Sequence, residues 1–481
     1  MPEQSHPPLA LIEAIIPVAT LILLVALSYH LFGDGGTSGP NQVALVIATM
    51  VAVVVTRRHG YTLDELRNAA IASVSTGIGA IFILFAVGAL IGTWALSGTL
   101  SAMVYYGLQL LNPNYFYVTT AAICALVSFG IGSSWTVVGT IGIGLMGISS
   151  NMGLDPAITA AAIISGAYFG DTTSPLSDSA NLAAGAANAD LYDHIRETSL
   201  ISILALLLSL GVFWFFSGTA SFDASAKMAA INKAFHISPA LFAPLILVVG
   251  LALLKIPPFT TIFIGALAGG VLAVIVAPDR VIAFANADDS VPGWLGLVKG
   301  VWLALASGYV STSGDPAIDM LATRGGMSSM LDTIWLVITA FAFGGVVEKT
   351  GILARLIAPI IGVAKTAGSL IAALVAAVVA TNVATADQYL AVVLPGRMFK
   401  NEFAARGMSP VALSRSIGAS ATPTSALIPW NSCGAYMTAT LGVSTFSYSP
   451  YAVFNIASPM LTIVAAFLGI RMLTRKASNL S

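Results

Sequence analysis

Two carboxylates lie in a short polar stretch between apolar segments of the chain. Asp171 and Asp178 belong to the segment 168–185, with Pro175 between them. In an unbroken helix these acids would share one face, about two turns apart. A proline removes a backbone hydrogen bond and clashes with the preceding turn, so we predict that the helix breaks near Asp171–Ser174. A kinked helix with its acids exposed in a surface loop is the alternative.

A broken helix at membrane depth offers particular chemistry. It exposes backbone carbonyls at one half-helix end and backbone amides at the other. Together with the hydroxyls of Thr172, Thr173 and Ser177 and a carboxylate, these carbonyls are hard oxygen ligands suited to Na⁺. A carboxyl group at this depth can also carry a proton. Acids in membrane segments are rare and indicate a functional site.

The second half of the chain repeats the proline spacing of the first half. Pro156 and Pro175 are 19 residues apart, as are Pro410 and Pro429, and a shift of 254 residues superposes both pairs. The second break, Ser420–Gly434, is rich in hydroxyl and amide side chains but has no acid. Corresponding interruptions in two halves point to the binding site of a secondary transporter. Polar contacts between packed helices are the alternative for the second copy.

Residues 115–145 and 368–395 are too polar at their centres to be straight spans. We predict that both are re-entrant hairpins, because irregular backbone at that depth must face protein or a wet cavity. The polar residues at the two centres are Ser128, Ser133 and Ser134 in the first hairpin and Asn382, Thr385 and Asp387 in the second. Asp387 is thus a third acid near the midplane. Its alternative role is to cap a helix at the hairpin turn.

The composition identifies a membrane protein. Hydrophobic residues make up 57% of the 481 residues and charged residues 9%, with a mean hydropathy of +0.90, whereas a soluble domain has about 25% charged residues. We predict an all-α polytopic membrane protein with about ten transmembrane helices, two re-entrant hairpins and two inverted repeats with broken helices. The predicted spans are residues 9–32, 41–56, 69–97, 156–187, 198–217, 238–255, 258–277, 330–349, 410–443 and 450–474.

The distribution of positive charge predicts the orientation of the chain. With a cytoplasmic N-terminus, most of the 20 Lys and Arg residues fall in predicted cytoplasmic segments. The matching loops 98–114 and 351–367 differ, because only the second contains Lys or Arg. We therefore expect inverted repeats at residues 1–217 and 218–481, in a bacterial inner membrane with both termini cytoplasmic. Residues 295–309 are expected to form an interfacial or partly buried helix.

Several classes of function lack support in the sequence. There is no Walker A motif, so ATP is not the expected energy source. Neither metal-ligand spacing nor a GxSxG motif is present, so we expect no enzyme and no cofactor. No basic patch indicates nucleic-acid binding, and Cys124 and Cys433 are expected to be buried thiols. Secondary transport is what remains, with an uncoupled channel or receptor as the alternative.

The stretch GDTTSPLSDSANLA at residues 170–183 resembles the NhaC Na⁺/H⁺ antiporter family, within the ion transporter superfamily. Residues 381–400 (TNVATADQYLAVVLPGRMFK) and 324–331 (RGGMSSML) carry the same resemblance, which extends over about residues 70–470. It implies exchange of cytoplasmic Na⁺ for external H⁺, although the family also contains malate/Na⁺-lactate antiporters. By analogy with the superfamily, the hairpins and broken helices would form a mobile transport domain that slides against a scaffold.

We predict that Na⁺ and H⁺ compete for the same carboxylates. Burial disfavours the charged form of a carboxyl group, which then holds either a proton or a cation. The predicted cation- and proton-binding residues are Asp171, Asp178, Asp387, Asn382, Thr385, Ser177 and Asn181, with Na⁺ at the three aspartates. The expected partners are Na⁺, H⁺ and the lipid bilayer. A small carboxylate and a second copy of the chain are further candidates.

The alternative function is a Na⁺- or H⁺-coupled carrier of a small organic anion such as lactate or malate. Half-helix amides would bind its carboxylate, and Arg415 would offer a fork of donors or else snorkel to the interface. The predicted substrate-binding residues are Thr424, Ser425, Asn431, Ser432, Ser133, Ser134 and Arg415. His194, flanked by charges, is expected to be a solvated loop residue.

Overall fold

The computed structural model describes residues 6–217, 225–286, 292–312, 319 and 322–469. In this part of the chain nearly all regular structure is helical, and the β-type pairing is confined to an isolated bridge between Tyr309 and Arg324. The predicted all-α class is thereby confirmed. Its physical cause is that a helix bonds its backbone polar groups within its own segment, as lipid surroundings require.

Eight helices of the described chain are long and apolar enough to cross a bilayer, or ten if each of two bent helix pairs counts as one span. The number of candidate spans agrees with the predicted number, but some of the spans are formed by other segments than predicted. Helices α5 (Phe116–Ile131) and α19 (Ala367–Thr385), predicted as hairpin arms, belong to segments that meet the criterion. The predicted spans 156–187 and 410–443 do not, because their polar breaks divide each into two shorter helices.

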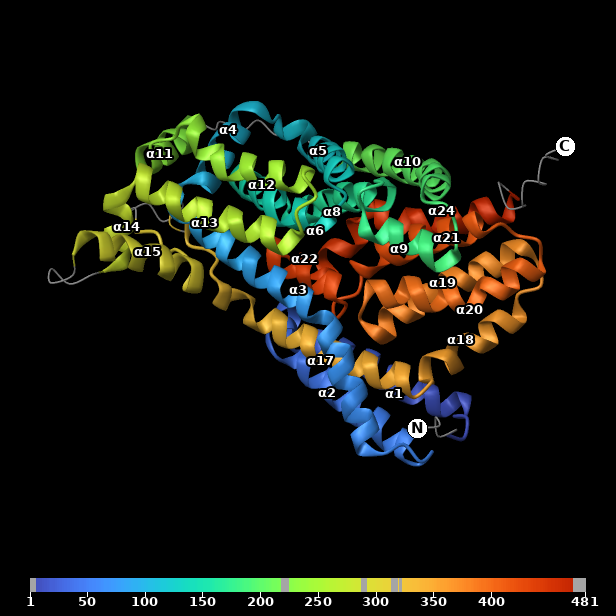
Figure 1. Cartoon of the computed structure of the whole chain (residues 1–481). Coiled ribbons are helices and arrows are strands. Elements are labelled where there is room, and N and C mark those ends of the chain that lie inside the picture. Colours follow the sequence, from blue (N-terminus) through green and yellow to red (C-terminus); the bar gives the residue numbers. More distant parts are fainter. Residues whose placement is uncertain (1–5, 218–224, 287–291, 313–318, 320–321, 470–481) are drawn as a thin grey trace.

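One group of helices surrounds the long helix α3, and we call it the frame group. Helix α3 packs against α13, α15 and α17, and α2 packs against α1 and α17. Figure 1 shows α1, α2 and α17 beside α3 on the side of the molecule that carries the N-terminus. The members are α1 (Leu11–Phe32), α2 (Pro40–Arg57), α3 (Leu63–Ser97), α12 (Ala243–Leu253), α13 (Pro258–Val276), α15 (Gly293–Ser307) and α17 (Leu331–Lys349).

A second group, the hairpin group, contains the predicted hairpins and broken helices. Helix α8 packs on α5 and α10, as its counterpart α21 packs on α19 and α24. The members besides α5 and α19 are α6 (Ser134–Val137), α7 (Ile143–Met152), α8 (Pro156–Thr173), α9 (Asp178–Ala187), α10 (Leu191–Phe216), α20 (Gln388–Ala405), α21 (Pro410–Ser425), α22 (Ser432–Leu441) and α24 (Val453–Phe467).

Short helices join the two groups where the sequence predicted loops. Helix α4 (Thr99–Leu110) follows α3, and α18 (Ile352–Val363) follows α17, so the loop predictions for 98–114 and 351–367 were wrong. In α18 the buried residues Ile352, Leu353 and Ile357 lie on one helical face, which explains why this segment is ordered as a helix. The other short helices are α11 (Ser225–Phe235), α14 (Pro278–Ala285) and α23 (Thr445–Tyr448).

Helix α15 covers most of the 295–309 segment, as predicted. Its 15 residues span roughly 22 Å, which is shorter than the ~30 Å hydrocarbon core. The predicted span 238–255 begins with a 3₁₀ turn at Pro239–Phe242 and is bent by 82° from the helical residues 227–235. The end of the predicted span 450–474 and the predicted cytoplasmic segment 471–481 lie partly or wholly outside the described residues.

Both predicted hairpins turn at a residue in the left-handed backbone region. Gly132 follows α5 with φ 78°, and Ala386 follows α19 with φ 57°. A residue with positive φ stops a right-handed helix and redirects the chain. The returning arms extend to Met152 and Ala405, beyond the predicted hairpin ends at 145 and 395.

Backbone and hydrogen-bond features recur after 254 residues in the two halves. Helices α8 and α21 begin at equivalent prolines, and α9 and α22 begin at equivalent positions. Ser128 Oγ donates to Ala167 O at 2.5 Å, and at the equivalent positions Asn382 Nδ2 donates to Ala421 O at 2.9 Å. These correspondences support the repeat interpretation. The inverted orientation and the boundaries 1–217 and 218–481 stay predictions.

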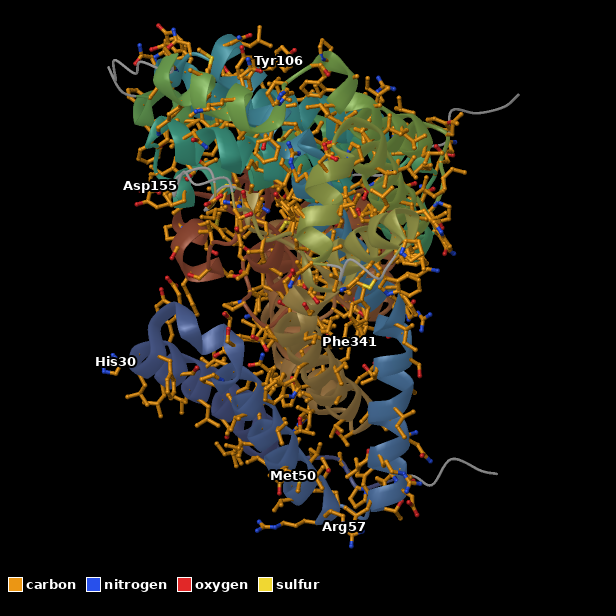
Figure 2. All side chains as sticks on the ribbon, turned by 90° about the vertical axis from the view of Figure 1, so that its left-hand side faces the viewer. His30, Met50, Arg57, Tyr106, Asp155 and Phe341 are labelled. Atoms are coloured by element: carbon orange, nitrogen blue, oxygen red, sulfur yellow. The ribbon has the colours of Figure 1, made fainter. Side chains whose placement is uncertain are left out.

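Figure 2 gives the positions of several labelled residues along the molecule. Arg57, in a predicted cytoplasmic segment, marks one end and Tyr106 lies toward the other, whereas His30, at a span end predicted outside, lies in the same half as Arg57 (Figure 2). Phe341 of α17 lies between these ends in the same view. The site described next involves this middle region.

Candidate functional site

A cavity of about 650 Å³ lies between the frame group and the hairpin group. The frame group contributes residues of the 76–83 segment of α3, Phe341 of α17 and the connection between α12 and α13. The hairpin group contributes both hairpin tips and both helix breaks. Asp171, Asp178 and Asp387 all line this cavity. The structure thus brings together the three acids that the sequence placed in two distant segments.

Asp171 lies in the last turn of α8 and is 5% exposed. Its Oδ2 accepts a hydrogen bond from Ser134 Oγ at 2.5 Å, and its Oδ1 accepts from Ser177 Oγ at 2.8 Å and from Ser179 Oγ at 2.9 Å. These hydroxyls come from the first hairpin and from the start of α9. No described Lys, Arg or His forms an ion pair with this carboxylate. Hydroxyls therefore fix its orientation while no counter-charge neutralises it.

Asp178 begins α9 and is exposed to the cavity. Its Oδ2 accepts a hydrogen bond of 2.6 Å from the hydroxyl of Tyr389, which belongs to α20 in the other half of the chain. Its Oδ1 accepts from the backbone N–H of Ser179 at 3.0 Å. This contact ties the first helix break to the tip of the second hairpin.

Asp387 is the N-cap of α20 and is 6% exposed. Its Oδ1 accepts from the backbone N–H of Tyr389 at 2.7 Å, so the capping role considered from the sequence is present. No described Lys, Arg or His forms an ion pair with its carboxylate. Asp387 thus caps a helix and also faces the cavity. Tyr389 contacts two of the acids, one through its backbone and one through its hydroxyl.

The three aspartates share one cavity but do not form one compact cluster. Among the described residues, no three His, Cys, Asp or Glu side chains are close enough together to hold a metal ion. A single Na⁺ bound by Asp171, Asp178 and Asp387 at once is therefore not the arrangement seen here. Separate positions for a cation or a proton within one cavity fit the geometry better.

The helix break at the first site follows from its residues. Helix α8 ends at Thr173 and α9 starts at Asp178, so the break begins at Ser174, the last residue of the predicted interval Asp171–Ser174, and contains Pro175. Ser177 caps α9 by accepting from the N–H of Ala180 at 3.3 Å. Asn181 lines the cavity, and its Nδ2 donates to the carbonyl of Ser177 at 2.6 Å. Local caps and side chains therefore satisfy much of the freed backbone.

Of the predicted substrate-binding residues, Ser133 and Ser432 line the cavity and Ser134 bonds Asp171. Ser425 lies beneath the cavity wall, where its hydroxyl donates to Gln388 Oε1 at 3.0 Å. This pair is equivalent, after the 254-residue shift, to the contact between Asp171 and Ser134. The carboxylate of Asp171 and the hydroxyl of Ser134 in the first half thus correspond to the hydroxyl of Ser425 and the amide of Gln388 in the second half.

The remaining amides and hydroxyls of the second half stabilise its own backbone. Asn382 Nδ2 donates to Thr424 Oγ1 at 3.0 Å, and Asn431 Nδ2 lies 3.2 Å from Asn382 Oδ1. The hydroxyl of Thr385 donates to the carbonyl of Thr381 at 2.9 Å. None of Asn382, Thr385, Thr424 and Asn431 is among the lining residues. Their donors satisfy buried backbone and amide groups, which would be costly to leave unpaired.

Arg415 does not reach the cavity. It is 2% exposed, and its Nη1 lies 3.6 Å from Glu197 Oε2 on α10. It therefore neither snorkels to the interface nor faces the predicted substrate site. The prediction for His194 was wrong, because this residue lies in the first turn of α10 and is buried with its Nδ1 3.1 Å from Ser414 Oγ. Packing of α10 on α21 excludes water from both side chains.

Several lining residues were not identified from the sequence. They are Tyr389, Gln388, Trp135, Lys255 and Phe341, to which Ser179 adds a bond to Asp171. Ser179 and Tyr389 each lie one or two residues from a predicted acid, and this proximity was the available signal. Lys255 and Phe341 belong to segments of ordinary loop or apolar composition, and only packing brings them to the site.

The chain is similar over most of its length to known antiporters. The sequence profile of the Na⁺/H⁺ antiporter family matches residues 9–200 and 166–470. The Na(+)/H(+) antiporter NhaC of Alkalihalophilus pseudofirmus is 34% identical over 89% of this chain and 90% of that protein. The malate-2H(+)/Na(+)-lactate antiporter of Bacillus subtilis is 32% identical over 95% of each chain. The arginine/ornithine antiporter ArcD of Halobacterium salinarum is 31% identical over 96% of this chain and 92% of that protein.

Proposed function

The chain belongs to the Na⁺/H⁺ antiporter family, and from this premise we propose that it exchanges cytoplasmic Na⁺ for external H⁺ at the cavity between the two helix groups. One observation carries the proposal: Asp171 and Asp178 from the first helix break and Asp387 from the tip of the second hairpin line the same cavity. Such acids would be costly in a membrane protein without a transported charge to bind. The proposed protein is thus a secondary transporter rather than an enzyme.

Competition between the two ions explains the exchange. A carboxylate removed from water is unfavourable when charged and unpaired, so it binds a proton or a metal cation. Asp171 is the candidate for the proton, because it is buried and forms no ion pair with a Lys, Arg or His among the described residues. Asp178 and Asp387 are the candidates for Na⁺, because each lines the cavity and is engaged by fewer side-chain hydroxyls than Asp171. Protonation on one side releases Na⁺, and Na⁺ on the other side displaces the proton.

Alternating access requires the site to reach both membrane sides. We place this movement between the hairpin group, which holds the acids, and the frame group, which forms the opposite wall. The facing part of α3 contains the small residues Thr76, Gly77, Gly79 and Ala80, which present a smooth surface. Helices α4 and α18 connect the groups and would act as hinged arms. A bacterial inner membrane, cytoplasmic termini and a homodimer belong to the same proposal.

The decisive test uses purified protein in liposomes with a trapped pH-sensitive dye. Asp171→Asn should abolish Na⁺-driven proton movement, because the amide can neither release a proton nor carry charge. Asp155→Asn is the matched control, since Asp155 caps the other end of α8 in an exposed position and Asn caps equally well. Wild-type exchange by Asp171→Asn, or Na⁺ flux without any linked proton flux in the unmodified protein, would contradict the proposal.

A carrier of a small organic anion is the second candidate. The relative from Bacillus subtilis that carries the name malate-2H(+)/Na(+)-lactate antiporter and the size of the cavity favour it. Lys255, Ser133 and Ser432 would provide donors for a carboxylate. Uptake of labelled lactate that depends on a Na⁺ gradient would support this function, and its absence alongside Na⁺/H⁺ exchange would exclude it.

A further inference from the structure

We propose that the cavity also binds a small organic cation, with an ammonium or guanidinium group on a short apolar chain, in competition with Na⁺. The inference rests on the proposed function in one respect, namely that the same acids bind Na⁺. It goes beyond that function by assigning a chemical class to an organic ligand. Size, wall composition and charge support it separately.

The volume of the cavity exceeds what a bound Na⁺ requires. The cavity measures about 650 Å³, whereas one water molecule occupies about 30 Å³ in the liquid. Cavities of roughly 300–1,000 Å³ are typical of sites for small organic molecules. An ion with a few waters would leave most of this space unused.

Apolar side chains from several elements form much of the wall. They include Ile83 of α3, Phe341 of α17, Ile256 and Pro257 between α12 and α13, and Trp135 at the first hairpin tip. Trp135 is held by stacking on Tyr436, with ring centroids 4.1 Å apart. A hydrated ion gains nothing from such surfaces, whereas an alkyl chain gains free energy for each methylene that leaves water.

The charges in the wall select a cation. Three lining residues carry carboxylates, and Lys255 is the lining residue that carries an amine. Asp387 is more than nine-tenths buried, lines the cavity, and forms no ion pair with a Lys, Arg or His of the described chain. A charged N–H donor of a ligand would supply the missing counter-charge.

The helix N-termini at the cavity do not reverse this preference. Helices that begin here are already capped by their own side chains, namely α6 by Ser133, α20 by Asp387 and α22 by Asn431. Asp178 adds a negative charge to the first turn of α9. The partial positive charge of these ends is therefore largely balanced before a ligand arrives.

The test compares inhibitors of Na⁺-driven proton movement in proteoliposomes. Guanidinium, ethylguanidinium and propylguanidinium stay charged and do not dissipate a pH gradient as permeant amines do, and butyrate and 4-guanidinobutyrate provide the anion and the zwitterion. We expect inhibition competitive with Na⁺ that strengthens about threefold to fourfold with each methylene. Butyrate should not inhibit, and the zwitterion should be weaker than propylguanidinium. Equal potency along the series, or stronger inhibition by either carboxylate compound, would overturn the proposal.

A binding measurement separates this inference from the proposed function. In Na⁺-free detergent solution, propylguanidinium should raise the unfolding temperature of the full chain, whereas equal concentrations of guanidinium and butyrate should not. If the wild type shows no Na⁺/H⁺ exchange, the proposed function fails, while this measurement still decides the inference. Stabilisation by butyrate alone would overturn the inference and leave Na⁺/H⁺ exchange intact.

A matched pair of variants locates the site. Phe341→Leu shortens an apolar wall residue and should weaken inhibition by propylguanidinium at least threefold more than it changes the half-saturating Na⁺ concentration. Phe82→Leu is the control, because Phe82 lies on α3 beside Phe259 and is not among the lining residues. An identical effect of both variants on the organic cation would place its binding elsewhere.

Discussion

Buried charges in this protein are handled in two different ways. Asp171 is surrounded by hydroxyls, so its charge stays available to a mobile ion. Arg415 instead lies beside Glu197, and the two charges largely neutralise each other within the protein. A group paired in this way has little left for a substrate, which assigns Arg415 a structural role between α10 and α21. Here the acid that lines the cavity is the one without an ion-pair partner among the described residues.

Variants of this pair test the assignment. Arg415→Leu removes the cation beside Glu197 and should lower the free energy of unfolding by roughly 3 kcal/mol, the lower end for a buried pair because Glu197 is partly exposed. Arg415→Leu combined with Glu197→Leu should recover at least half of that loss, because both charges are then absent. Denaturant unfolding in detergent measures both effects.

The double variant also separates structure from transport. If Arg415 has no contact with substrate, the stable double variant should keep its half-saturating Na⁺ concentration within about twofold of the wild type, since a contact to a charged group contributes more than this. A well-folded double variant without exchange would show that Arg415 binds a transported species.

At the scale of elements, the two hairpin tips have a similar backbone conformation but different residues at the turn. Gly132 and Ala386 occupy equivalent positions and both have positive φ. An added Cβ at Gly132 would lie 2.6 Å from the backbone carbon of Leu176, so this tip presses against the first helix break. The second tip accommodates an alanine and accepts a hydrogen bond from the N–H of Ser432 at 2.9 Å. The glycine is therefore required by close approach as well as by backbone conformation.

Three substitutions separate these two requirements. Gly153→Ala has a similar φ of 70° with open space around it and should cost about 1–2 kcal/mol of stability from backbone strain alone. Gly132→Ala should cost more than Gly153→Ala and should also raise the half-saturating Na⁺ concentration, because the clash displaces Leu176 and Ser177. Ala386→Gly should stay within about 1 kcal/mol of the wild type, because relief of strain offsets the added chain entropy.

Thermal unfolding in detergent and proton movement in liposomes provide the two readouts. Equal destabilisation by Gly132→Ala and Gly153→Ala would mean that the first tip can move away from Leu176 at no cost.

At the scale of the whole molecule, the cavity lies between the frame group and the hairpin group rather than inside one of them. Its acids belong to the hairpin group, and its opposite wall belongs to α3, α17 and the α12–α13 connection. Helices α4 and α18, which follow α3 and α17, lead from the frame group into the two hairpins. Connectors at equivalent positions would allow the rigid-body displacement proposed above.

Cross-linking tests that displacement. Ala80→Cys on α3 and Leu176→Cys at the first helix break both line the cavity, and a bifunctional thiol reagent should join them and stop exchange. The background should lack Cys124 and Cys433. Joining Phe82→Cys to Phe259→Cys, whose rings pack 5.4 Å apart within the frame group, should leave exchange unchanged.

A monofunctional reagent on the same double variant controls for modification itself. Inhibition by the bifunctional reagent alone, reversed by thiol reduction, supports movement between the groups. Full exchange in the cross-linked protein would exclude it.

Much of the architecture followed from local physics that the sequence displays directly. Long apolar runs specify helices, because backbone groups in lipid must form their hydrogen bonds within the segment. Pro175 breaks its helix whatever the tertiary contacts of that helix are, because proline removes a backbone hydrogen bond and clashes with the preceding turn. The positions of Asp171, Asp178 and Asp387 at such interruptions were therefore predictable, as was the matching break in the second half. The errors at α4 and α18 arose because short amphipathic helices resemble loops in composition.

Tertiary structure alone decided which polar groups serve the cavity and which serve the fold. At a helix break the backbone leaves several donors and acceptors open, and a nearby side chain can equally satisfy them or face outward. Packing resolved this choice: Asn382, Thr424 and Asn431 bond one another or nearby backbone, and Arg415 lies beside Glu197. Only the contact between distant elements brought Tyr389, Lys255 and Phe341 to the acids. The sequence by itself determined the long apolar helices, the helix breaks and the acids, because these depend on each residue and its neighbours. The membership of the site depends on contacts between segments far apart in the chain.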